Sequence, residues 1–131
     1  MGIFSWLFGR DAIDLSGDGT FALDVVGESN YQKSLKKICG GYSKESQEVL
    51  VTATLIHEND NPHDKNSVRI DIGKRTVGYL GRDDARRHRR YIKKNGREGQ
   101  DADCPAKIVG GWNRGRKDRG AFGVVLDMPY A

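Results

Sequence analysis

The residues best suited to chemistry in this sequence are a run of cations and, upstream of it, a turn rich in amide and carboxylate groups. Eight Lys or Arg residues lie between Arg82 and Arg97, and the turn occupies residues 59–66 with the sequence NDNPHDKN. Clustered cations bind polyanions by releasing counterions. Asn, Asp and His side chains can exchange hydrogen bonds with bases, sugar hydroxyls and phosphates. These residue types favour nucleic-acid binding, with a solvated basic face that has no partner as the alternative.

The positive charge is concentrated in the second half of the chain. The net charge is +4 over 131 residues. Residues 82–131 hold 13 basic and 7 acidic side chains, a balance of +6, whereas residues 1–81 hold 9 and 11, a balance of −2. A second basic group, RGRKDR at 114–119, follows in a glycine-rich loop. The two groups together strengthen the nucleic-acid interpretation.

A short helix must present the first basic run. Asp83 or Asp84 is suited to the start of a helix, and Asn95-Gly96 to its end. Ala85, His88 and Ile92 recur at spacings of three and four, so one narrow apolar face can dock on a core. Six cationic residues cover most of the rest of the helix and face away from that core: Arg86, Arg87, Arg89, Arg90, Lys93 and Lys94.

Composition excludes several other classes. The chain has no GxxxxGK[ST] sequence and therefore no P-loop, and it has no apolar run long enough to span a membrane. Its two cysteines, Cys39 and Cys104, are too few for a disulfide framework and are typical of reduced thiols in a cytoplasmic protein.

Enzymatic interpretations find little support in the sequence. The residues His57, Glu58, His63 and Asp64 could ligate a metal, but their spacing matches no metal motif. No Ser/His/Asp or Cys/His arrangement indicates a nucleophile. We therefore expect no cofactor, no metal and no catalytic activity, with a metal-dependent nuclease as the least favoured alternative.

The first ten residues, MGIFSWLFGR, are apolar and aromatic. They predict a short amphipathic turn that docks on the domain or on a partner, followed by a flexible connection over residues 11–20. The expected organisation is thus an N-terminal segment and linker (1–19) and one domain (20–131). A protein-interaction adaptor docking through Ile3, Phe4, Trp6, Leu7 and Phe8 is the alternative function.

The remaining chain predicts a mainly β (α+β) domain. Strands are expected at 20–27, 47–58, 67–72, 75–80, 107–112 and 120–128, with helices at 30–39, capped by Asn30, and at the basic run. The turns between the three central strands are too short for parallel crossovers, which implies antiparallel pairing. A small OB-like antiparallel barrel of about six strands with two short helices satisfies these constraints.

Three segments together resemble the HIRAN domain family. They are VVGESNY at 25–31, ENDNPHDKNSVRI at 58–70, and VGYL at 77–80 before a helix. The resemblance, in the correct order over nearly the whole chain, implies an OB-like barrel that binds DNA, in the best-known eukaryotic member by capturing a single-stranded 3′ end. The function expected here is recognition of single-stranded DNA ends or of distorted DNA in repair or replication. Eukaryotic members are fused to a helicase-type ATPase. Here a helicase or another DNA-processing protein would act in trans.

The resemblance also carries individual residues over. Asn61 would bond a base edge or phosphate, Asp64 would accept a hydrogen bond from a terminal 3′-hydroxyl, and His63 would stack on a base in place of the family's Tyr. Asn61 and Asp64 could instead simply hold the turn, and Tyr79 and Phe122 could be core aromatics. The full predicted DNA-binding set is Asn30, Tyr31, Asn61, His63, Asp64, Tyr79 and Phe122, with Arg86, Arg87, Arg90 and Lys93 attracting the backbone.

Overall fold

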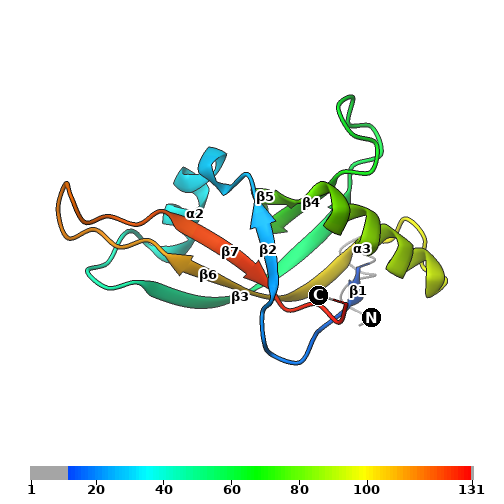
Figure 1. Cartoon of the computed structure of the whole chain (residues 1–131), viewed down its shortest axis with the longest axis horizontal. Helices are drawn as coiled ribbons and strands as arrows, with labels where there is room; N and C mark the ends of the chain where they lie inside the picture. The colour runs from blue at the N-terminus through cyan, green and yellow to red at the C-terminus, as the bar shows by residue number, and fades with distance from the viewer. Residues whose placement is uncertain (1–11, 131) are drawn as a thin grey trace.

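Residues 12–130 are described in a computed structural model, and they form a small OB-like β-barrel (Figure 1). The seven strands are β1 (Ile13–Asp14), β2 (Leu23–Val26), β3 (Gln47–His57), β4 (Val68–Ile72), β5 (Arg75–Leu80), β6 (Ala102–Gly110) and β7 (Phe122–Leu126). Their order in the sheet is β1-β6-β3-β4-β5-β2-β7, and pairing of β6 with β7 closes six antiparallel strands into the barrel. The predicted fold class is confirmed.

Strand β2 closes the barrel by serving two neighbours in turn. Its first half pairs with β7, through Leu23 opposite Leu126, and its second half pairs with β5, through Val25 opposite Leu80. Alternation places every second residue of β4 and β6 inside. The interior is therefore lined by aliphatic side chains from all six strands, and burial of their apolar area is the main source of stability.

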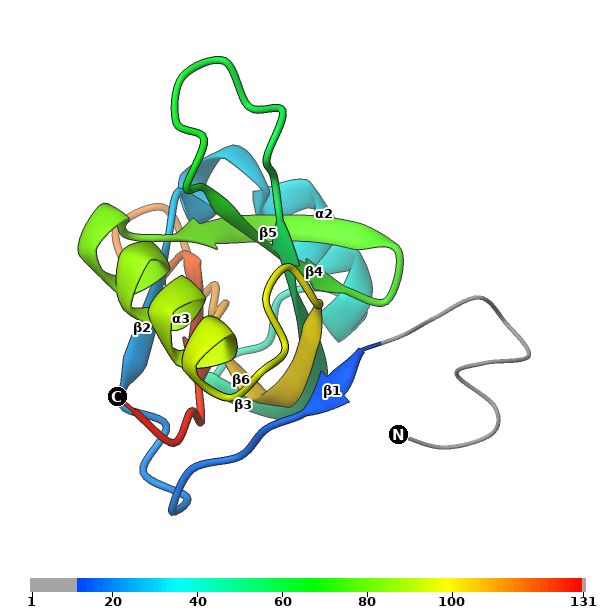
Figure 2. The ribbon, with the colours of Figure 1, turned by 90° about the vertical axis from the view of Figure 1, so that its right-hand side faces the viewer.

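Two α-helices and one 3-10 turn surround the barrel: η1 (Glu28–Asn30), α2 (Gln32–Cys39) and α3 (Arg82–Lys94). Figure 2 shows α3 lying across one end of the barrel. The narrow face predicted for it is confirmed, because Ala85, His88 and Ile92 are buried. Its C-terminal residue is followed by Asn95, as expected from the sequence. Helix α2 buries Leu35 in the core from the other side of the barrel.

The prediction of a flexible connection was wrong for residues 12–20. Ala12 is buried, and β1 pairs in parallel with β6, Ile13 lying opposite Ala102. The buried carboxylate of Asp127 then accepts a hydrogen bond from the Gly19 amide at 3.0 Å. A two-residue strand has no periodicity to detect, so these long-range contacts leave no local trace in the sequence.

Two further local predictions were wrong. Asn30 does not cap α2: Gly27, with a left-handed φ of 78°, starts a 3-10 turn, and Tyr31 becomes the residue preceding the helix. Strand β6 begins at Ala102 rather than Lys107. Pro105 interrupts the expected pattern because proline lacks the amide donor that strand pairing uses, yet it lies opposite Thr52 within the ladder.

Candidate nucleic-acid interface

The turn 59–66 is held by its own side chains. The Asn61 Oδ1 atom accepts hydrogen bonds from the amides of His63 (2.9 Å) and Asp64 (3.3 Å), and Asp64 Oδ1 accepts one from the Asn66 amide (2.9 Å). Asx turns of this kind preorganise a loop. Asn61 and Asp64 therefore do hold the turn, and their loop leaves the His63 side chain exposed to solvent.

Arg89 of α3 fixes both ends of this turn. Its Nε and Nη2 atoms donate to the carbonyl oxygens of Asn66 and Ser67, each at 2.8 Å, and its Nη1 atom donates to Asn59 Oδ1 at 2.8 Å. A planar guanidinium can donate to three such acceptors at once. The ammonium group of a lysine cannot reach the same three acceptors with this geometry. Sequence reasoning missed this role because helix and turn lie far apart in the chain. One sequence signal could have suggested this role: position 89 borders the buried face of α3.

A cationic hollow of about 290 Å³ lies between α3 and the turn. Arg89, Arg90 and Lys93 line it on the helix side, and the amide side chains of Asn59 and Asn66 on the turn side; His57, Glu98 and Gly99 complete the wall. The single carboxylate, Glu98, lies 4.0 Å from Lys93. The lining thus has a net excess of positive charge together with neutral hydrogen-bonding groups, a combination suited to phosphate.

The predicted backbone-binding cations differ in their surroundings. Arg86 pairs with Asp83 at 3.2 Å and Arg87 with Asp84 at 3.8 Å, one turn earlier on α3. Exposed pairs of this kind contribute little free energy and exchange readily for another anion. Within residues 12–130, Arg90 forms no ion pair. Arg90 and Lys93 share the hollow, whereas Arg86 and Arg87 lie outside it.

A second polar cluster centres on Glu58, at the end of β3. Its Oε2 atom accepts hydrogen bonds from Arg69 Nη1 (3.1 Å) and the Tyr79 hydroxyl (3.3 Å), and its Oε1 atom accepts one from Asn61 Nδ2 (3.1 Å). Burial, the Glu58 carboxylate and the neighbouring Tyr31 phenol raise the pKa of Tyr79 to about 12. Two predicted residues, Asn61 and Tyr79, therefore meet at Glu58, which the prediction did not include, and a third, Tyr31, lies beside Tyr79. We call these residues and Arg69 the Glu58 cluster.

Phe122 belongs to the core. Its exposed fraction is 3%, and its ring stacks on Tyr42 with centroids 5.2 Å apart and planes 20° from parallel. The predicted stacking of a base on Phe122 is therefore wrong as a direct contact, because Tyr42 and the barrel cover the ring. Tyr42 is itself 44% exposed and is the more exposed of the two rings. Asn30 is exposed at the end of η1.

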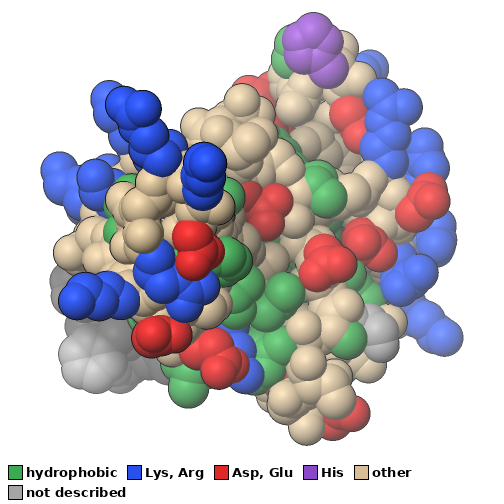
Figure 3. All heavy atoms as spheres, turned by 60° about the vertical axis from the view of Figure 1, so that its left-hand side comes forward, with side chains coloured by type: hydrophobic (Ala, Val, Ile, Leu, Met, Phe, Trp, Pro, Cys, Tyr) green, Lys and Arg blue, Asp and Glu red, His purple; other side chains and the backbone are tan. Residues whose placement is uncertain are grey.

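The two basic groups that are close in sequence lie far apart in the fold. Strand β6 separates the end of α3 from the 114–119 loop, and its nine residues span roughly 30 Å. Figure 3 shows Lys and Arg side chains in two groups on opposite sides of one face, with Asp, Glu and apolar side chains between them. The basic surface is thus divided.

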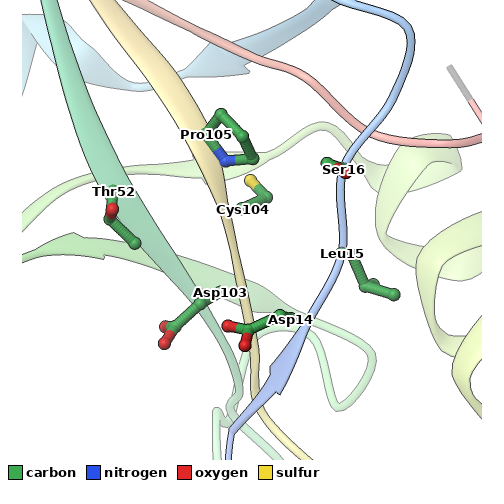
Figure 4. Close-up of a pocket in the computed structure, with 7 residues that line it drawn as sticks. All are labelled: Asp14, Leu15, Ser16, Thr52, Asp103, Cys104 and Pro105. Carbon is green, nitrogen blue, oxygen red and sulfur yellow. The ribbon is translucent and has the colours of Figure 1, made fainter. Parts of the chain in front are cut away.

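A separate hollow of about 260 Å³ lies beside β1 (Figure 4). Asp14 and Asp103 are register partners at its edge, and Thr54 donates a hydrogen bond to Asp103 at 2.6 Å. Cys104 also lines it, but burial, with nearby Asp103 and Asp127, raises the pKa of this thiol to about 12. Cys104 is therefore a protonated, unreactive thiol at neutral pH.

In residues 12–130, no three His, Cys, Asp or Glu side chains converge as metal ligands. None of the helices described has the length and apolar character needed to cross a membrane. The apolar segment with Ile3, Phe4, Trp6, Leu7 and Phe8 lies outside the described residues, so its docking role stays a prediction.

Comparison with family models, with curated proteins and with solved structures finds no match for the chain. The resemblance to the HIRAN family therefore rests on the sequence segments themselves.

Proposed function

We propose that this protein binds single-stranded nucleic acid, and specifically DNA ends, through the hollow beneath α3 and the adjoining Glu58 cluster. The observation that carries the proposal is the cationic hollow, where Arg90 and Lys93 face Asn59 and Asn66 across about 290 Å³. Cations attract the phosphate backbone, and amides add hydrogen bonds that place a single phosphate. Residues of the HIRAN-like segments form one wall of this hollow.

Recognition of a free 3′-hydroxyl is the finer part of the proposal. Asp64 uses Oδ1 to hold the turn, while its Oδ2 accepts no hydrogen bond from residues 12–130 and could accept one from a hydroxyl. The exposed His63 ring beside it offers a stacking surface. A terminal 3′-phosphate would bring a second negative charge against the Asp64 carboxylate, so it should bind more weakly. Remodelling of the DNA would then belong to an ATPase acting in trans.

The test uses fluorescence anisotropy with labelled single strands that carry a 3′-hydroxyl, a 3′-phosphate or no free end. Titrations at 50 and 200 mM salt give the slope of log affinity against log salt. The double variant Arg90→Gln/Lys93→Gln should reduce the size of that slope by about 1.4, because each phosphate contact on a single strand contributes about 0.7. Lys74→Gln, on the exposed hairpin between β4 and β5, is the matched control and should leave the slope unchanged.

The outcomes separate the two parts of the proposal. Absence of binding to all three strands would overturn the proposed function. Equal binding to all three would remove 3′-end recognition and leave general strand binding. Binding that is insensitive to the double variant would show that the hollow under α3 is not the site.

A further inference from the structure

Helix α2 carries a second group of cations that neither the sequence motifs nor the proposed site includes. Lys33, Lys36 and Lys37 lie at spacings of three and four, which places them on one side of the helix. Together with Gly40 and Gly41 they line a hollow of about 410 Å³. Among residues 12–130 none of the three lysines has an ion-pair partner, and the segment 29–44 contains no Asp or Glu. This surface carries positive charge that the fold leaves uncompensated.

An aromatic side chain stands at the far end of the same surface. Tyr42 is 44% exposed, and its position is fixed from beneath by the parallel ring of Phe122. Lys36 Nζ lies 5.1 Å from the Tyr42 ring centroid, so a cation and an aromatic face are presented together. A rigid exposed aromatic beside cations is the arrangement on which bases of a single strand stack while its phosphates are neutralised.

The two ends of α2 connect this surface with the Glu58 cluster. Tyr31 precedes the first residue of the helix, and Tyr42 follows its end by three residues. The eight residues of α2 are about 12 Å long, a distance that a strand of a few nucleotides can bridge. Along the chain, the three lysines lie between these two aromatic residues. Glycines at positions 40 and 41 have left-handed φ values of 77° and 114° and no side chain to obstruct the approach.

We propose that α2 is a track for single-stranded nucleic acid, in which Tyr42 stacks on a base and Lys33, Lys36 and Lys37 contact the phosphates that lead away from the Glu58 cluster. This inference rests on the proposed function, because it extends the bound strand beyond the first site. It assigns a binding role to Tyr42, and it makes Phe122 a support for the stacking ring. Contacts with α2 should therefore make affinity depend on the length of the strand, and not on the chemical group at its 3′ end.

The experiment measures anisotropy of labelled oligothymidylate and oligouridylate of 4 and 12 nucleotides with the full chain. Tyr42→Ala should weaken binding of the 12-nucleotide strands about tenfold, the effect expected for loss of one stacked base. Tyr42→Phe should retain affinity within about twofold, because it keeps the ring. The triple variant Lys33→Gln/Lys36→Gln/Lys37→Gln should reduce the salt slope for the long strands by about 2. Leu50→Ala, at an exposed apolar position on β3, is the control.

Several results would overturn the inference while leaving the proposed function intact. One is a wild-type protein that binds through Arg90 and Lys93 but is indifferent to Tyr42→Ala and to the lysine variant. Another is displacement of the labelled strand by polyglutamate as effective as displacement by unlabelled strand of the same charge. That result would show that the surface binds any polyanion. Failure of the wild type to bind any strand would overturn both proposals. Because the lysine variant changes only exposed side chains, it tests the track even if Tyr42→Ala is poorly folded.

Discussion

Acidification from pH 7.5 to 5.0 is expected to destabilise this fold through His88, the one histidine that faces the core from α3. The His88 side chain is fully buried, and its Nδ1 atom lies 2.6 Å from the Tyr130 hydroxyl. Its Nε2 atom has no hydrogen-bond partner among the described residues. The His57 ring packs edge-on against it, with centroids 5.5 Å apart. This environment accommodates a neutral imidazole ring and not a positively charged imidazolium.

The sign and size of the effect follow from the pKa of His88. Burial, with His57 and Arg89 nearby, lowers that pKa from 6.5 to about 3. Between pH 6.5 and pH 3 the unfolded chain binds a proton at His88 that the folded chain does not. The free energy of unfolding is therefore at its full value above pH 6.5 and decreases as the pH falls below it. Integration of this linkage from pH 7.5 to 5.0 gives a loss of about 2 kcal/mol. Burial, and then the nearby Arg89, lower the pKa of His57 as well, so protonation of His57 destabilises the fold in the same pH range.

The assay is urea unfolding followed by circular dichroism at pH 7.5 and pH 5.0, for the wild type and for His88→Gln. Carboxylates titrate alike in both proteins, so the difference between their pH dependences isolates position 88. The wild type should lose about 2 kcal/mol more than the variant over this range. In parallel, the His88 ring signals of the native protein should show no titration by NMR between pH 8 and pH 5.

Two results would refute this reasoning. One is a His88 resonance that titrates in the native protein with a midpoint near 6.5, which would mean that solvent reaches the ring. The other is a His88→Gln variant whose stability changes with pH as steeply as that of the wild type. Should the variant not fold, the NMR titration of the wild type still decides the question.

Three further expectations concern the framework around the candidate site. Gln32→Ala should lower the free energy of unfolding by about 2 kcal/mol in urea titrations, because the Gln32 amide donates to the Phe122 carbonyl and accepts from its amide, each at 2.9 Å; an unchanged midpoint would contradict it. Arg89→Lys should raise the rate of amide hydrogen exchange across residues 59–67 and change the rate in β6 little. An equal change in exchange rate in the turn and in β6 would show that the Arg89 guanidinium is not what holds the turn. In mass spectrometry of the native protein at pH 8, Cys104 should escape alkylation by iodoacetamide, since burial raises the pKa of its thiol to about 12; rapid modification would show that the pocket beside β1 opens.

Much of the architecture was predictable from local pattern. Residues 67–72 alternate with period two, and β4 is found at Val68–Ile72 with alternating burial. The spacing of Ala85, His88 and Ile92 identified the buried face of α3 correctly. Short turns between the central strands implied antiparallel pairing, which the barrel confirms. Each of these features depends on residues that are close together in the chain, and their physical constraints are visible in the sequence.

The candidate site was predicted less completely. Asn61, Tyr31 and Tyr79 were expected to act together; Glu58 joins Asn61 to Tyr79, and Tyr31 lies beside Tyr79. Glu58 itself is an unremarkable acid at the end of a strand, and only its three hydrogen bonds reveal its position. For Phe122 the sequence left base stacking and core packing as alternatives; the ring is in the core, and Tyr42, stacked on it, is the exposed aromatic. Packing decides which of two neighbouring aromatics reaches solvent, and residue type does not.

By itself, the sequence determined that the chain forms a β-rich domain with a strongly basic helix beside an amide-rich turn, because alternation, helical spacing and turn chemistry are local properties of the backbone. The tertiary structure decided how the charge is arranged. It joins the turn to α3 through Arg89, separates the two basic groups by the length of β6, and places the lysines of α2 beside Tyr42 with no ion-pair partner among the described residues. These relations depend on contacts between residues far apart in the chain, and such contacts exist only after the barrel has closed.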